Sequence, residues 1–130
     1  MKWRAWLTGP IVIAMAGCAS SGPTLSNSVE RLEDSSFALE RHAEERSVRA
    51  EARDLSEEAR DFRRTLIHYR ADRLDVHEAF GDLSRRYHDL RDEVERSRGR
   101  DTERYFEPVT AAYLDIEREF SGRDRYARDN

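Results

Sequence analysis

Histidine residues are the first place to look for chemistry in this chain, because an imidazole can bind a metal ion or transfer a proton near neutral pH. The sequence contains four, His42, His68, His77 and His88. His77 and His88 are eleven residues apart, so on a helix they share a face but lie about 16 Å apart along the axis, at about 1.5 Å per residue. At that distance they cannot hold one ion together. They are weak metal candidates, and we expect neither a metal site nor another cofactor.

Motifs that would indicate an enzyme are missing from the sequence. No Glu-x-x-His pair of the kind used by di-iron bundles is present, and there is no Gly-rich phosphate loop, nucleophile elbow or Cys-x-x-Cys-His haem motif. Acidic residues occur throughout, as on any highly charged helix, and do not by themselves identify a hydrolase. We therefore expect no catalytic residues and no enzymatic activity. Metal or stress sensing by histidines with neighbouring carboxylates is the alternative function.

The one cysteine, Cys18, follows a segment typical of export signals. Two basic residues, Lys2 and Arg4, precede an apolar run over residues 5–16, which is too short to span a bilayer and ends in small side chains. The sequence Met15-Ala16-Gly17-Cys18 resembles the lipobox of bacterial lipoproteins, with Met15 where Leu is most common. The resemblance implies cleavage between Gly17 and Cys18, which removes residues 1–17, and attachment of fatty acyl chains such as palmitate to Cys18.

The resemblance also implies a location. Several acyl chains on one residue give stable membrane attachment, whereas a single chain binds only marginally. Ala19 is not the Asp that favours retention in the inner membrane, so we expect an outer-membrane anchor with the chain facing the periplasm. Residues 18–26 form the lipidated end and a small, polar tether of about 25 Å at full extension. With its only thiol lipidated, the mature chain forms no disulfide.

Charge and helix formers dominate the rest of the chain. Two of the 23 basic residues, Lys2 and Arg4, precede Cys18, so 21 basic residues, all Arg, and 27 acidic residues follow, and their net charge is −6. Arginines interleaved with acids form no continuous basic stripe, which argues against a nucleic-acid partner. A composition this charged is compatible with disorder unless its apolar residues are periodic.

Apolar residues do recur at alternating steps of three and four, which predicts amphipathic helices. The stripes comprise Val29, Leu32, Leu39, Ala43, Val48, Ala52, Leu55, Ala59, Phe62, Leu66, Tyr69, Val76, Phe80, Leu83, Tyr87, Leu90, Val94, Phe106, Val109, Tyr113, Ile116 and Phe120. One-sided stripes require a facing helix. We therefore predict an all-α fold, a small elongated antiparallel helical bundle or hairpin of three to four helices with coiled-coil-like stripes.

The helical domain is predicted over residues 27–122, with a charged tail over residues 123–130. The stripe shifts near Arg46, which indicates either a stutter in one helix or a short turn between two. A break is expected near Arg73 and another at Gly99, Gly122 is expected to close the last helix, and Pro108 is placed in that helix's first turns.

Tyrosines are candidate contact residues, because Tyr is enriched at the energetic centres of protein interfaces. Tyr69, Tyr87 and Tyr105 are the weak partner-binding candidates, with core packing as the alternative at helical spacing. The sequence as a whole favours a lipid-anchored adaptor or envelope-maintenance protein that contacts a protein partner, or itself, through a helix face.

Overall fold

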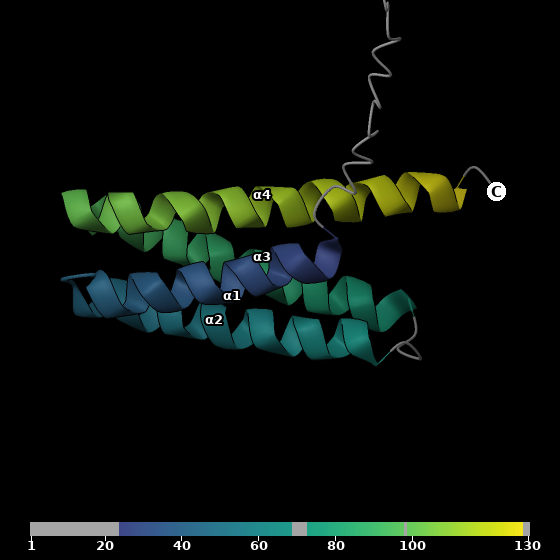
Figure 1. Ribbon diagram of the computed structural model, residues 1–130, viewed down its shortest axis with the longest axis horizontal. Coiled ribbons are helices and arrows are strands. Elements are labelled where there is room, and N and C mark those ends of the chain that lie inside the picture. Colours follow the sequence, from purple (N-terminus) through teal and green to yellow (C-terminus); the bar gives the residue numbers. More distant parts are fainter. Residues whose placement is uncertain (1–23, 69–72, 98, 129–130) are drawn as a thin grey trace, which may run out of the picture.

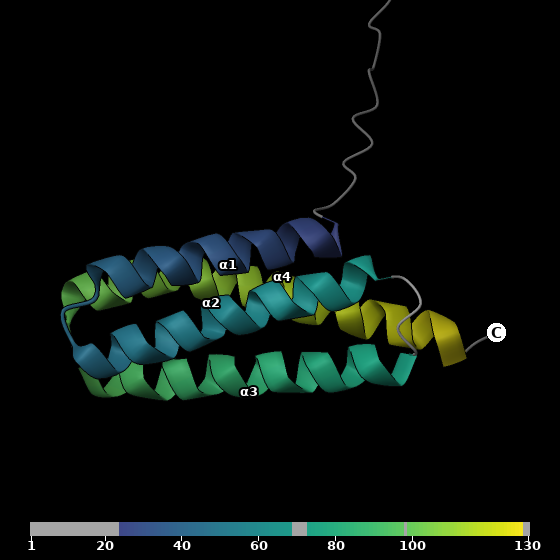
Figure 2. The ribbon, with the colours of Figure 1, turned by 90° about the horizontal axis from the view of Figure 1, so that it is seen from below.

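Four helices make up the described part of the chain. The computed structural model describes residues 24–68, 73–97 and 99–128, and no strand occurs among them. The helices are α1 (Leu25–His42), α2 (Arg46–Ile67), α3 (Arg73–Ser97) and α4 (Arg100–Arg128). They lie side by side as an elongated bundle in which each helix runs antiparallel to the one before it (Figures 1 and 2). The prediction of an all-α bundle is confirmed, with four helices.

The helices are not equally close to one another. α1 packs on α2 and α4, and α2 packs on α3, whereas the backbones of α3 and α4 approach at far fewer points. Small buried side chains, including Ala52, Ser56 and Ala59, allow α1 and α2 to pack closely. Between α3 and α4, ring stacking fills the wider space, with the Tyr87 and Tyr113 centroids 3.9 Å apart. Tyr113 also shares a hydrogen bond of 2.7 Å with Ser84.

The predicted stripes form the core. Their described members are buried, or pack partly buried against the buried ones. A bundle of this size without a disulfide depends on such burial, because each one-sided helix is only marginally stable alone. The central part of every predicted stripe is therefore confirmed, and the differences concern helix ends.

Three of the predicted breaks coincide with helix boundaries. Residues 43–45 separate α1 from α2. Of the two alternatives near Arg46, a stutter in one helix or a short turn between two, the structure shows the turn. The break expected near Arg73 is confirmed in that α3 begins at this residue. Gly99 directly precedes α4, and the Glu103 amide already donates to the Gly99 carbonyl at 3.0 Å, so Gly99 itself occupies the N-cap position.

Three boundary predictions are wrong. α1 begins at Leu25 rather than at residue 27, and the Thr24 hydroxyl caps it by accepting a hydrogen bond from the Asn27 amide at 3.4 Å. Gly122 does not close the last helix, since α4 continues to Arg128. A single glycine costs a helix interior only about 1 kcal/mol, which continued helix formation offsets. Pro108 lies inside α4, beyond its first turns. Proline has no amide N–H, so one backbone carbonyl of the preceding turn loses its helical partner, and because Pro108 is exposed, water can reach this part of the helix.

Candidate functional site

Helix α2 has two polar flanks of opposite charge. Side chains three or four residues apart lie on the same face of a helix, so Arg60 and Arg63 share one flank while Glu51, Glu58 and Asp61 share another. The arginine flank faces α1, where both guanidinium groups reach Glu33. The carboxylate flank faces α3.

The flank that faces α1 is complementary in charge. Glu33 of α1 accepts from Arg60 Nε at 3.0 Å, and Arg63 Nη2 lies 3.2 Å from its second carboxylate oxygen. The Ser56 hydroxyl donates to the Glu33 backbone carbonyl at 3.4 Å, which adds a polar contact between the two helices. Charge-assisted bonds of this kind are stronger than neutral ones, and they fix α1 against α2.

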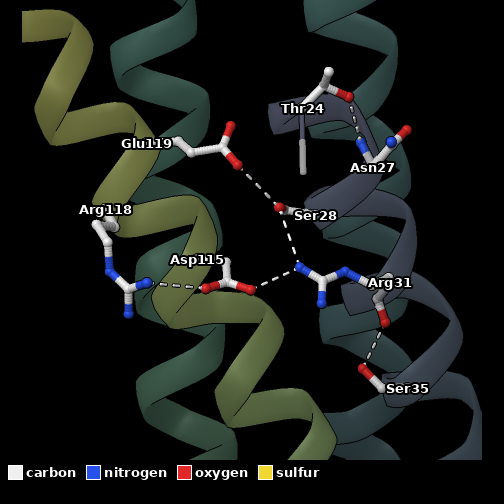
Figure 3. A network of polar contacts seen from close by, with 8 residues as sticks. All are labelled: Thr24, Asn27, Ser28, Arg31, Ser35, Asp115, Arg118 and Glu119. Atoms are coloured by element: carbon white, nitrogen blue, oxygen red, sulfur yellow. Dashed lines mark hydrogen bonds and ion pairs between the residues drawn. The ribbon is translucent and has the colours of Figure 1, made fainter. Parts of the chain in front are cut away.

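The interface between α1 and α4 is also matched in charge (Figure 3). Arg31 Nη2 donates to Asp115 Oδ2 at 2.7 Å and to the Ser28 hydroxyl at 3.4 Å. Ser28 donates in turn to Glu119 Oε1 at 3.3 Å, and Arg118 supports the other Asp115 oxygen at 3.4 Å. The network joins the first turns of α1 to α4.

The interface between α2 and α3 is acidic on both sides. We call its two rows of carboxylates the acidic seam, which consists of Glu51, Asp54, Glu58 and Asp61 on α2 and Asp75, Glu78, Asp82, Asp89 and Glu93 on α3. Within the described side chains, one ion pair crosses it, from Arg86 to Asp54 at 3.8 Å. Other arginines pair along their own helix, as Arg85 does with Asp82 at 3.2 Å. The seam therefore retains an excess of negative charge.

This excess changes the protonation of Glu51. Burial raises the pKa of Glu51 above its ordinary value, and the charge of Asp54 adds to the rise. Asp89 and Glu93 raise it further from across the seam, while Arg86 opposes them. The carboxylate at this position is thus less favourable in the folded bundle than in water.

Glu58 is perturbed in the same direction. Burial raises the pKa of Glu58, followed by the charges of Asp82 across the seam and of Asp61 on α2. Arg86 and Arg85 lower it but do not cancel the rise. A perturbed carboxyl in a groove is a feature of many binding and catalytic sites, although structural charge clusters also produce it.

The acidic seam opens into a groove at one end. The groove has a cavity volume of about 440 Å³ and is lined by Glu58, Asp61, Phe62, Arg64, Thr65, His68, Asp75, Glu78, Ala79 and Asp82. Partly exposed Ala79 supplies apolar surface above the fully buried Phe62, and carboxylates dominate the rim. We call it the α2–α3 groove. Its lining residues come from the end of α2 and the start of α3, which lie at the end of the bundle where α1 begins (Figures 1 and 2).

Two large apolar side chains are exposed at this same end. Ile67, the last residue of α2, is 66% exposed, and Leu74 near the start of α3 is 70% exposed. Isolated exposed apolar residues are common on proteins, but the next residue after each of these two, His68 and Asp75, lines the groove. The groove and its surroundings therefore combine charge with exposed apolar area.

The tyrosine candidates occupy different environments. Tyr87 is 5% exposed, stacks on Tyr113 and donates to the Thr110 hydroxyl at 3.2 Å. Tyr87 therefore belongs to the core, the alternative that its helical spacing allowed, and is not available for contact with a partner. Tyr105 is partly buried and stacks on the His42 ring at 4.3 Å, which ties α4 to α1. Tyr69 lies outside the described residues.

The two histidine candidates are separate, as their spacing predicted. His77 meets the edge of Phe120 at 5.0 Å, and His88 lies against Tyr113 at 6.1 Å. Among the described side chains, no three His, Cys, Asp or Glu residues are grouped in a way that could hold a metal ion. His68, another of the four histidines considered from the sequence, lines the α2–α3 groove.

The predicted lipidation site, Gly17 and Cys18, lies outside the described residues. Of the helices that the structure describes, none is both long and apolar enough to cross a membrane. Comparisons of the chain with protein-family models, with curated proteins and with solved structures give no match. The site must therefore be interpreted from its own geometry.

The sequence reasoning missed the acidic seam. The spacing of Glu51, Glu58 and Asp61 was a usable signal, because it places them on one flank beside the apolar stripe. The pattern of α2 alone does not show which neighbour that flank meets. The seam can be recognised only once the structure shows that the carboxylates of α3 face those of α2.

Proposed function

We propose that this chain is a lipid-anchored helical protein of the bacterial outer membrane, facing the periplasm, which acts as an adaptor by docking a partner protein on a helix face. The docking surface is the α2–α3 groove, and the partner segment that fits it is a cationic amphipathic one. Its basic side chains would meet the carboxylate rim while its apolar side chains meet Ala79 and the exposed Ile67.

One observation carries this proposal. The α2–α3 groove combines a cavity of about 440 Å³ and an apolar lining with an excess of carboxylates over cations among the side chains that line it. In the other interfaces of α1 and α2, by contrast, opposite charges face each other at hydrogen-bonding distance. Charge complementarity contributes mainly specificity and association rate, and the apolar lining supplies the area to be buried.

Site-specific photo-crosslinking in the native envelope tests the docking surface. A photoreactive residue at Thr65, in the groove, should give one reproducible adduct, whereas the same residue at exposed Ala111 of α4 should not. Mass spectrometry should locate the adduct in a basic segment of the partner. The charge reversals Asp75→Lys and Glu78→Lys should abolish it. Adducts at both positions, or adducts that persist after charge reversal, would contradict the proposal.

The anchor needs an independent test, because its residues are not described by the structure. Cys18→Ser removes the thiol that would carry the lipid, and we expect the variant to leave the outer-membrane fraction for the soluble periplasmic fraction. Ser20→Ala, in the tether, is the matched control and should stay with the membrane. Membrane association of the Cys18→Ser chain at the level of the control would refute the anchor.

A further inference from the structure

The acidic seam is a cluster of like charges held between two helices. Glu58 is partly buried and lines one groove together with Asp75, Glu78 and Asp82 of α3. Glu51 is also partly buried, and its Oε2 atom has no hydrogen-bond partner among the described residues. The charged groups around Glu51 are Asp54, Asp89, Glu93 and Arg86, and those around Glu58 are Asp61, Asp82, Arg85 and Arg86. His68, Arg64, Asp75 and Glu78 also line the groove at the end of this seam. The seam therefore concentrates many acids beside few cations.

Helix α1, the other neighbour of α2, contributes no relief. Its Glu33 is engaged on the opposite flank by Arg60 and Arg63. Arg85 and Arg86 offset the repulsion between α2 and α3 only in part. Protonation, salt or a bound cation would reduce it further. Of these, protonation acts directly on the carboxyl groups themselves.

We propose that the interface between α2 and α3 is an acid-responsive element of the bundle, in which α3 packs more firmly on α2 as the medium changes from neutral to mildly acidic. The groove loses negative charge in the same step. If the proposed function holds, a cationic partner docked in the groove is released by acid. The response of the bundle itself does not depend on any partner.

The direction follows from proton linkage. The pKa values of Glu51 and Glu58 are raised in the folded bundle, so the folded state binds more protons than the unfolded chain between the ordinary and the raised pKa. Above the raised pKa, the two carboxylates reduce the stability of the fold. That loss is recovered as the pH falls through the raised pKa toward the ordinary one.

Urea unfolding of the full chain carrying Cys18→Ser tests the proposal without a partner or a lipid. The unfolding midpoint of this background should rise by a few tenths of a molar between pH 7.5 and pH 5.0. Adding Glu51→Gln and Glu58→Gln should raise the midpoint at pH 7.5. The same two substitutions should remove most of the increase in midpoint between pH 7.5 and pH 5.0. Glu57→Gln, on the exposed side of α2, is the matched control, and its midpoint should increase between pH 7.5 and pH 5.0 as much as that of the background.

The comparison of the background with the double variant isolates the two glutamates, because every other titratable group is common to both proteins. Sodium chloride at about 0.5 M should also raise the midpoint of the background at pH 7.5, and less so in the double variant, because salt screens exposed like charges. An equal pH response in the background and the double variant would overturn the proposal. A double variant that fails to fold at pH 7.5 would overturn it as well. Failure to find a partner by crosslinking would leave this result unaffected.

Discussion

The two flanks of α2 both pack against a neighbouring helix, but one interface pairs opposite charges and the other brings like charges together. Toward α1, Glu33 lies within 3.0 Å of Arg60 and 3.2 Å of Arg63, so charge and packing favour the same arrangement. Toward α3, Glu51 and Glu58 face further carboxylates, and one ion pair at 3.8 Å crosses the described part of the interface. Burial of apolar side chains must therefore hold α3 in place against charge repulsion.

This difference shows how stability and responsiveness are divided in a small bundle. α1 is tied by polar contacts to both of its neighbours, α2 and α4, through Glu33 and Arg31. α3 depends on its core residues, such as Leu83 and Leu90, and on ring stacking with α4. The contrast predicts that changes to the acidic seam and changes to the α1 interfaces have opposite signs.

The largest expected effect comes from removing the core that both interfaces share. Phe62 is fully buried, and Phe62→Ala should lower the free energy of unfolding by about 3–5 kcal/mol. Phe37, which is 51% exposed on α1, is the matched control, and Phe37→Ala should cost less than about 0.5 kcal/mol. Urea unfolding monitored by circular dichroism measures both. Similar losses in the two variants would show that the apolar core does not have the role assigned to it.

The next largest effect is expected from disrupting the charge-paired interface between α1 and α2. Glu33→Gln removes a carboxylate whose side chain is 12% exposed and which serves two arginines, so we expect a loss of about 1–2 kcal/mol at pH 7. The arginines are themselves partly solvated, which limits the cost. Glu30→Gln, at an exposed position of α1, should have little effect. A Glu33→Gln chain as stable as the parent would remove the contrast between the two flanks.

A smaller effect should strengthen α3 without touching the charges. Gly81 lies inside α3, and a methyl group added to it would meet no atom within 4 Å. Gly81→Ala should therefore stabilise the bundle by about 0.5–1 kcal/mol, since alanine is the better helix former. Thermal and urea unfolding both report this gain. A destabilised Gly81→Ala chain would mean that the exposed side of α3 is covered in solution.

The smallest effect concerns a single carboxylate of the acidic seam. Glu51→Gln alone should raise stability at pH 7 by a few tenths of a kcal/mol, because it relieves like-charge repulsion at a partly solvated site. The gain should shrink as the pH falls toward the ordinary pKa of glutamic acid, where the native carboxyl is also neutral. Urea titrations at several pH values measure it. A gain that does not depend on pH would point to packing rather than charge.

The apolar stripes predicted most of the fold, because a helix that buries one stripe leaves a periodic record in the sequence. They located the core of all four helices and the shift at Arg46, but not the persistence of α4 beyond Gly122. A glycine is compatible with both a helix end and a helix interior, and the free-energy difference between these outcomes is small. The burial of Tyr87, likewise, was one of two outcomes that its spacing allowed.

The α2–α3 groove could not be predicted in the same way. The order of charges along α2 shows that one flank is acidic, but its neighbour is set by how the helices are arranged around the core. Glu33 and Glu58 are both helical acids in the sequence, yet Glu33 faces arginines and Glu58 faces Asp82. Tertiary arrangement, rather than residue type, separates a stabilising carboxylate from a perturbed one.

Native-state hydrogen exchange, resolved by helix at pH 7.5, tests the central contrast most directly. It gives an opening free energy for each protected segment of the folded chain. We predict that the amides of α3 exchange through openings of lower free energy than those of α1, and that Glu51→Gln with Glu58→Gln narrows the gap. Equal opening free energies in α1 and α3 would contradict the account, as would a gap that the double substitution leaves unchanged.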